Sequence, residues 1–161
     1  MNNWINRTKI GGINIYDYLS NKEAMEEVSI GFSQRSNGVL KGAIGALDGW
    51  LVRIVCPSLW RDGIRNVTAF YSRKGFYALN VQCIVDDKKR VLWVSYSHKG
   101  GSHDSTSFCS TKLYDHLRGI SKKLLDNEYF ILGDSAYCIE SFLLPSYDYA
   151  SSKTPEDFFN Y

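Results

Sequence analysis

Three short acidic phrases supply the side chains of this chain that could do chemistry. Asp48 stands in Ala-Leu-Asp-Gly-Trp, Asp104 in Ser-His-Asp-Ser, and Asp134 in Leu-Gly-Asp-Ser-Ala-Tyr. Carboxylates that meet at one end of a sheet can hold hard divalent cations, which activate a nucleophile and stabilise a leaving oxygen. The three aspartates are therefore candidates for a metal site of the kind that cuts phosphodiester bonds.

Each aspartate also has a simpler structural interpretation. Asp48 with Gly49 is a favoured turn pair, Asp104 precedes an apolar-periodic segment as an N-cap would, and Asp134 follows an apolar run that a turn could end. Taken singly, each residue is better explained as a turn or a cap. The functional interpretation therefore depends on whether the fold brings the three together.

The elements that would position these aspartates can be read from hydrophobic periodicity. The pattern predicts a helix over 21–32, capped by Asn21, and a second helix from Asp104 to about Leu117, ended by Gly119. Apolar runs on both sides of Asp48 and Gly49 predict a hairpin there. Near-alternation of strand-forming residues predicts strands at 75–85, 90–97 and 129–132, and a last short helix is expected over 139–144.

This order of elements predicts an α/β fold with a mixed sheet. Three strands in succession favour antiparallel pairing, and the strand at 129–132, which follows a helix, is expected to return beside the first strand. Asp48 and Asp134 would then lie at neighbouring strand ends. The glycine-containing loop at 98–103 would carry Asp104 to the same rim.

Composition narrows the class of protein. The chain has 161 residues, 44% of them hydrophobic and 22% charged, which suits one soluble domain. No apolar run approaches the ~18–20 residues that span a bilayer, so no membrane partner is expected. The net charge of +2 argues against a protein that coats DNA, so nucleic-acid contacts would be local, as at Arg73 and Lys74. The cysteines form no Cys-x-x-Cys pair, which argues against a zinc knuckle.

Four phrases taken together resemble the DDE endonuclease domain of PIF/Harbinger-type transposases. They are Gly-Ala-Ile-Gly-Ala-Leu-Asp-Gly-Trp ending at residue 50, the run 71–82, Gly-Ser-His-Asp-Ser at 101–105, and Leu-Gly-Asp-Ser-Ala-Tyr at 132–137. Their order and rough spacing also agree with that family. The resemblance covers the chain from about Gly42 to Tyr161.

The resemblance implies a ribonuclease-H-like fold, in which a mixed sheet is flanked by helices. It implies that residues 41–161 form the nuclease domain and that residues 1–40 are a helical remnant or linker. Asp48 and Asp134 match the family's first two catalytic aspartates, and Asp104 matches a further residue of the metal site. The implied cofactor is Mg²⁺ or Mn²⁺.

The family also implies a partner and a place in the cell. DNA would be the substrate, at transposon ends or at a target, with a separate DNA-binding protein as a further partner. The location would be the nucleus in a eukaryote, and otherwise the interior of the cell. Two metal ions would act on the phosphodiester, with Asp48 bridging them, and Arg73 and Lys74 would contact the DNA backbone.

One feature of the family is not matched. Its last acidic residue is a glutamate on a later helix, and Glu156 stands too close to Asp134 to take that role. We therefore expect a domain truncated at its C-terminus, with impaired activity. The alternatives left open are a non-catalytic, domesticated or decayed module that binds DNA or protein, and an unrelated hydrolase of small phosphate esters.

Overall fold

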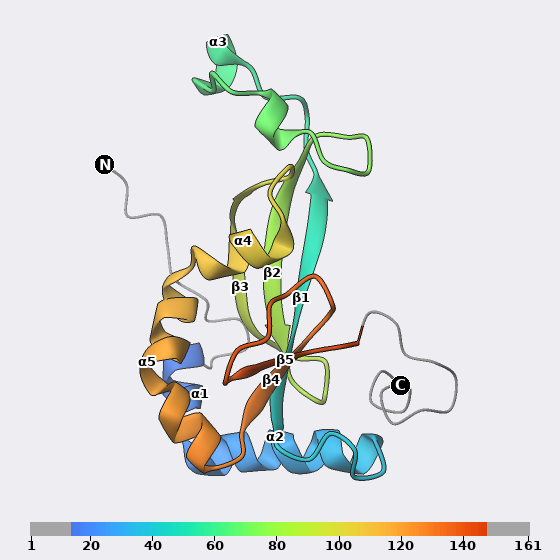
Figure 1. The fold of residues 1–161 in the computed structure, drawn as a ribbon. Helices are drawn as coiled ribbons and strands as arrows, with labels where there is room; N and C mark the ends of the chain where they lie inside the picture. The colour runs from blue at the N-terminus through green and yellow to red at the C-terminus, as the bar shows by residue number, and fades with distance from the viewer. Residues whose placement is uncertain (1–13, 148–161) are drawn as a thin grey trace.

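The computed structural model describes residues 14–147 and has an α/β fold built on a five-stranded mixed sheet (Figure 1). The strand order is β3-β2-β1-β4-β5, with β1, β2 and β3 antiparallel and with β4 parallel to both β1 and β5. The strands are β1 (Ala43–Arg53), β2 (Ala78–Val85), β3 (Val91–Lys99), β4 (Phe130–Gly133) and β5 (Leu143–Pro145). This is the expected ribonuclease-H-like sheet flanked by helices.

Two helices precede the first strand, one lies between β1 and β2, and two lie between β3 and β4. Within residues 14–147 they are α1 (Ile15–Ser20), α2 (Lys22–Arg35), α3 (Leu59–Asp62), α4 (Asp104–Cys109) and α5 (Lys112–Asp126), with a 3-10 turn at Thr68–Phe70. The prediction of a helix over 21–32 is confirmed by α2. Asn21 caps that helix as expected, because its side chain accepts a hydrogen bond of 3.2 Å from the Ala24 amide.

The predicted hairpin at Asp48 and Gly49 is wrong, because β1 runs straight through both residues. Every residue of β1 from Ala46 to Arg53 pairs with β2, from Val85 back to Ala78. The apolar runs on either side of the Asp-Gly pair therefore share one partner strand instead of pairing with each other. Extended cross-strand pairing outweighs the local turn preference of the dipeptide.

The segment after Asp104 also differs from its prediction. Two helices replace one, because Thr111 starts α5 by accepting a hydrogen bond of 3.1 Å from the Tyr114 amide. Gly119 lies inside α5 and does not end it. Residues 139–144 contain the start of β5 where a helix was expected, since Leu143 and Leu144 pair with β4.

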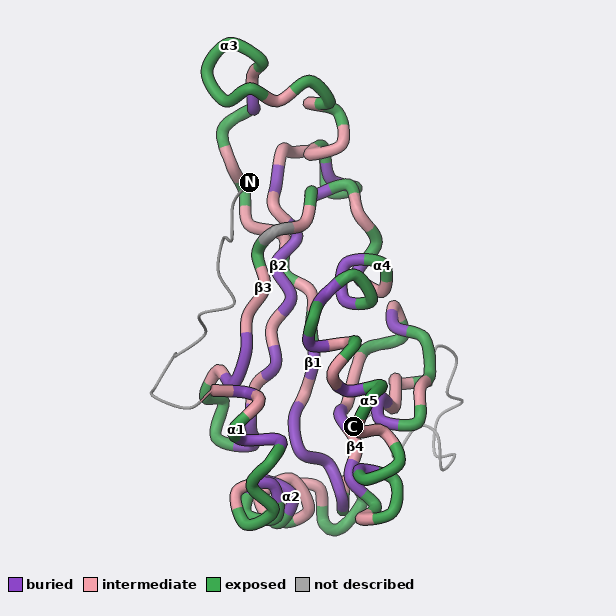
Figure 2. The backbone as a smooth tube through the Cα atoms, turned by 90° about the vertical axis from the view of Figure 1, so that its left-hand side faces the viewer, coloured by how far each residue is buried: buried purple, intermediate pink, exposed green. Residues whose placement is uncertain are grey.

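The core lies where the strands meet the helices, and buried backbone follows the middle of the sheet (Figure 2). Phe108 of α4 packs edge-to-face on Trp93 of β3 and on Tyr137, at ring separations of 6.2 and 6.0 Å. These contacts fix α4 against the sheet, and Asp104 opens that helix. Helices α1 and α2 contribute to the same core through Ile15, Tyr18, Leu19, Met25 and Val28.

None of the described helices is long and apolar enough to cross a membrane.

Candidate active site

Asp48 and Asp134 lie side by side because β1 and β4 run parallel. Leu47 of β1 is paired with Gly133 of β4, and each aspartate directly follows one of these two residues. Asp48 Oδ1 accepts a hydrogen bond of 2.7 Å from the Gly49 amide, and Asp134 Oδ1 accepts one of 3.0 Å from the Ala136 amide. Within residues 14–147, the second oxygen of each carboxylate accepts no hydrogen bond. The predicted adjacency of these two residues is therefore present.

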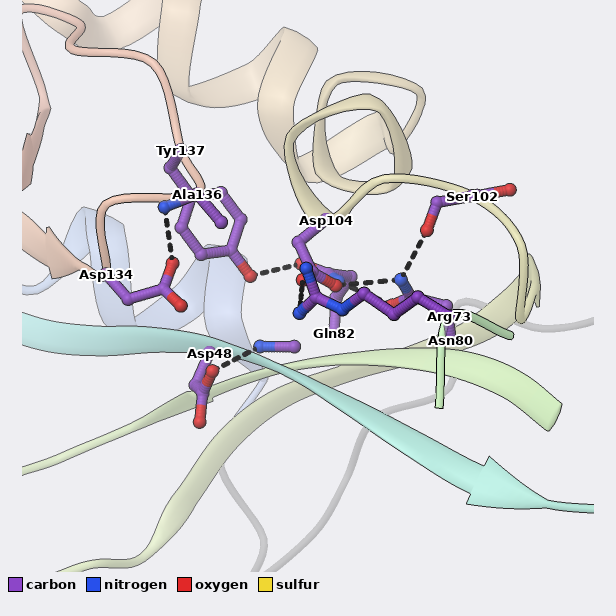
Figure 3. Close-up of polar contacts among 10 residues, drawn as sticks. Asp48, Arg73, Asn80, Gln82, Ser102, Asp104, Asp134, Ala136 and Tyr137 are labelled. Carbon is purple, nitrogen blue, oxygen red and sulfur yellow. Dashed lines mark hydrogen bonds and ion pairs between the residues drawn. The ribbon is translucent and has the colours of Figure 1, made fainter. Parts of the chain in front are cut away.

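Asp104 is placed differently, as a buried acid held by amides. It is the first residue of α4 and is 9% exposed, and the N-cap position belongs to His103. Its Oδ1 accepts hydrogen bonds of 2.7 Å from Asn80 Nδ2 and 3.2 Å from Gln82 Nε2 (Figure 3). Its Oδ2 lies 3.7 Å from Arg73 Nη2. The Asp104 carboxylate is thus held by two buried amides and lies beside one guanidinium.

Asp48 and Asp104 lie on opposite sides of β1. A Cβ atom built on Gly49 would lie 2.2 Å from Asp104 Oδ1, so Gly49 faces Asp104. Side chains alternate along a strand, and Asp48 therefore points the other way, as Figure 3 shows. Its cross-strand partner there is Cys83, whose thiol pKa is raised by burial and then by the negative charge of Asp48.

A buried polar chain links the loop that carries Asp134 with the helix that carries Asp104. The Tyr137 hydroxyl donates a hydrogen bond of 2.6 Å to Gln82 Oε1, and Gln82 Nε2 donates one of 2.7 Å to Asn80 Oδ1. The side-chain amides of Asn80 and Gln82 in turn donate hydrogen bonds to Asp104 Oδ1. The chain fixes the relative position of the two acidic loops, since each link is buried and hydrogen-bonded.

Sequence reasoning missed Asn80, Gln82 and Tyr137. A signal was present, because Asn80 and Gln82 alternate with Leu79 and Val81 inside a strand that is otherwise apolar. Both amide residues are 1% or less exposed, and buried polar side chains of this kind need partners. Two polar residues at alternate positions of an apolar strand predict a buried hydrogen-bonding network on one face.

The local field at this end of the sheet is negative. The pKa of Asp134 is raised above its usual value by burial first, and then by the charges of Asp48 and Asp104. The Ala136 amide and Arg73 act in the opposite direction. Burial and the same three carboxylates raise the pKa of Tyr137 far above its usual value. Such a field attracts a cation.

The fit of these residues to a metal ion is incomplete. Carboxylate oxygens are the ligands that Mg²⁺ prefers, and Asp48 and Asp134 supply them. However, no group of three or more His, Cys, Asp or Glu side chains that could hold a metal ion occurs in the part of the chain that the structure describes. Glu156 lies outside the described residues. Asp48 and Asp134 are therefore the two candidate ligands that the pairing of β1 with β4 brings close together.

A cavity of about 280 Å³ lies beside Asp104 and includes both predicted DNA contacts, Arg73 and Lys74, in its lining. The Arg73 side chain is 70% exposed, whereas that of Asp104 is 12% exposed. Trp50 and the glycine loop at 100–101 line the same cavity. The two basic residues are thus next to the acidic site, in a position where they could contact an anion.

Comparison with protein families gives a match over most of the chain. The family model described as DDE superfamily endonuclease matches residues 47–159, a range that includes all three aspartates. No curated protein and no solved structure matches the chain.

Proposed function

Because this chain belongs to the DDE superfamily endonuclease family, we propose that it is the nuclease domain of a PIF/Harbinger-type transposase. Its substrate would be DNA, cut at phosphodiester bonds with Mg²⁺ or Mn²⁺. The family match supports the endonuclease class. The four phrases described above, at 42–50, 71–82, 101–105 and 132–137, support the subtype.

One observation carries this proposal: the pairing of Leu47 with Gly133 sets Asp48 and Asp134 side by side. Each carboxylate uses one oxygen to accept a backbone amide, which orients it. In the described residues the other oxygen is left for a ligand. Two oriented carboxylates on adjacent parallel strands, one inside β1 and one directly after β4, are suited to binding a hard cation together.

Divalent ions bound there would polarise the scissile phosphate and lower the pKa of an attacking water or 3′-hydroxyl. The protein's own contribution is to hold those ions through Asp48 and Asp134 and to place the DNA. Arg73 and Lys74 would bind phosphate oxygens through charge-assisted hydrogen bonds. Asp104 would orient Arg73, because its Oδ2 lies 3.7 Å from the guanidinium.

The two-metal version of this mechanism, in which Asp48 and Asp134 would hold the ions with Asp104 near the site, stays part of the proposal. So do a nuclear location and a separate DNA-binding protein as partner. The alternative of a non-catalytic binding module is favoured by one observation, the lack of a three-ligand group within residues 14–147. A measurement of metal binding distinguishes the non-catalytic module from a metal-dependent nuclease.

Calorimetry supplies the test. Mn²⁺ is titrated into the full chain and into an Asp48→Asn/Asp134→Asn double variant. Asp126→Asn is the matched control, since Asp126 is exposed at the end of α5. We expect binding in the parent chain and in the control, and loss of binding in the double variant. Equal binding in all three, or none in the parent, would contradict the proposal and favour the non-catalytic module.

A further inference from the structure

The connection between β1 and β2 forms an arm, residues 54–77, that projects beyond the end of the sheet (Figure 1). A hydrogen bond of 2.9 Å from the Ile54 amide to the Tyr77 carbonyl closes its base. Another of 2.9 Å, from the Gly101 amide to the Ala69 carbonyl, ties the arm to the loop before α4. Both bonds join backbone atoms, so substitutions of exposed side chains on the arm leave them in place.

The arm is strongly basic for its length. It carries four basic side chains and one acidic side chain, a net charge of +3, whereas the whole chain has a net charge of +2. The basic side chains are all exposed; they are Arg61, Arg65, Arg73 and Lys74. The one acid, Asp62, forms an ion pair of 2.9 Å with Arg61, so it leaves the other three cations uncancelled within the arm. The arm therefore accounts for all of the positive net charge of the chain.

Two of these cations lie beside the acidic site. Residues Ser72 to Phe76 form a tight turn, closed by a hydrogen bond of 2.8 Å from the Ser72 amide to the Phe76 carbonyl. Arg73 and Lys74 occupy the exposed part of this turn. Arg73 Nη2 lies 3.7 Å from Asp104 Oδ2, and both cations line the same cavity as Asp104. A phosphate held by these two cations therefore lies next to the acidic site.

The tip of the arm places an exposed tryptophan beside another cation. Trp60 on α3 is 97% exposed. The helix is well formed, because the Ser58 side chain accepts a hydrogen bond of 3.0 Å from the Arg61 amide. The Ile64 amide donates a hydrogen bond of 3.4 Å to the Ser58 carbonyl, so Arg65, the next residue, lies near the start of α3. An exposed aromatic side chain among arginines is typical of a surface that contacts nucleic acid.

We propose that the arm is a second DNA contact, which binds the duplex that flanks the cutting site; this inference rests on the proposed nuclease function. Arg65 binds a phosphate of that duplex, and Trp60 packs in a groove against sugars and base edges. Charge decides the occupant, because a polyanion complements an arm of net charge +3, whereas a second copy would bring the same positive charge against it. The cations of the tip also extend the pair formed by Arg73 and Lys74.

The length of β1 separates the arm from the acidic site. Asp48 stands five positions before Arg53, the last residue of the strand, so at about 3.3 Å per residue the arm begins about 17 Å beyond Asp48. A duplex rises about 3.4 Å per base pair, so one that lies along β1 covers this distance with about five base pairs. A single duplex can therefore reach both places, and substitutions at the tip change DNA binding without altering the acidic site.

Fluorescence anisotropy of a labelled 30-base-pair duplex, titrated with the full chain in EDTA at several salt concentrations, tests the arm. Arg65→Gln should reduce the slope of log K against log salt by about 0.9, the value of one phosphate contact. Trp60→Ala should weaken binding about fivefold or more at each salt concentration with the slope unchanged, because its contact is uncharged. Lys122→Gln is the matched control, since Lys122 is exposed on α5, away from the arm (Figure 1). Circular dichroism verifies that each variant folds.

A parent chain that does not bind the duplex would overturn this proposal, as would Arg65→Gln and Trp60→Ala chains that bind it like the parent. A parent dimer that sediments without DNA and is abolished by Trp60→Ala would also overturn it, and would assign the arm to a second copy. Because EDTA removes the metal, failure of the nuclease is distinguishable from failure of the arm. A chain that binds no Mn²⁺ in calorimetry contradicts the nuclease, whereas arm variants with unchanged DNA binding contradict the arm contact alone.

Discussion

The carboxylate of Asp104 lies against the backbone of Gly49, so closely that a Cβ atom on residue 49 would come within 2.2 Å of Asp104 Oδ1. Residue 49 must therefore be glycine because a side chain there would collide with Asp104, and not because the backbone turns there. It lets the start of α4 approach β1 on one side while Asp48 occupies the other. The two residues of the Asp-Gly phrase have different roles: one offers a carboxylate, and the other makes room for one.

Gly49→Ala should destabilise the protein by about 1–3 kcal/mol, because the new methyl group would displace a buried carboxylate and its hydrogen bonds. Urea unfolding followed by circular dichroism measures this. Gly119→Ala is the matched control, since a Cβ atom at that position of α5 would meet nothing within 4 Å. It should stabilise the helix by roughly 0.5–1 kcal/mol. A neutral Gly49→Ala would contradict the close contact.

Asp104→Ala should cost about 1–3 kcal/mol, because it leaves the Asn80 and Gln82 amides without their buried acceptor. Asp104→Asn keeps an acceptor oxygen and should cost less. Because the Asn80 and Gln82 amides occupy Oδ1 of Asp104, Asp104→Asn should weaken Mn²⁺ binding less than Asp134→Asn does. Calorimetry on both variants checks this, and an equal loss would make Asp104 a direct ligand, as the family resemblance implies.

Asp134 should make stability depend on pH in a defined direction. Its folded pKa is raised above the ordinary 3.8, so the folded state binds the proton more tightly than the unfolded state. The stability this provides is complete below pH 3.8 and is lost as the pH rises through the folded pKa. Asp134→Asn should lack this loss in pH-dependent urea unfolding.

Carbon-detected NMR titration of the aspartate carboxyls gives the same shift directly. Asp48→Asn should bring the pKa of Asp134 back toward its ordinary value, because the Asp48 charge is one of the causes of the shift. Burial is the larger cause, so part of the shift should remain. A pKa of Asp134 that does not move in Asp48→Asn would mean that the two carboxylates are not coupled.

Tyr137→Phe should destabilise the protein by about 1–3 kcal/mol, since it leaves Gln82 Oε1 buried without its donor. Tyr96→Phe is the control, because Tyr96 is 49% exposed on β3, and its effect should stay within about 0.5 kcal/mol. Thermal unfolding of both variants decides the matter. Equal stability of the two would show that the polar chain from Tyr137 to Asp104 does not hold the acidic loops.

The sequence predicted the fold class, the return of the 129–132 strand beside the first, and the adjacency of Asp48 and Asp134. These depend on hydrophobic periodicity and on parallel pairing, which are visible along the chain. It did not predict that β1 continues through Asp48 and Gly49, because a dipeptide with a strong turn preference can be extended when a long partner strand is available. A strand at 75–85 was predicted, but its continuous pairing with residues 46–53 becomes apparent only in three dimensions.

The hydrogen-bond partners of Asp104 could not be predicted from the sequence either. Its hydrogen bonds come from Asn80 and Gln82, more than twenty positions earlier in the chain. Their alternation marks one polar face of a strand, yet no local pattern says which acid that face will meet. The exposure of Trp60, which is 97% on α3, was missed for a similar reason, since the sequence does not reveal whether an aromatic residue between two strands packs or projects.

The most direct test of the proposed nuclease is nicking of supercoiled plasmid DNA by the full chain in Mg²⁺ or Mn²⁺, with EDTA as the blank. The parent chain and Asp126→Asn should nick the plasmid, at a reduced rate, when the metal is present. Asp48→Asn and Asp134→Asn should each abolish nicking while leaving the fold intact by circular dichroism. No metal-dependent nicking by the folded parent, or nicking that survives in both aspartate variants, would contradict the assignment of Asp48 and Asp134 as the working pair.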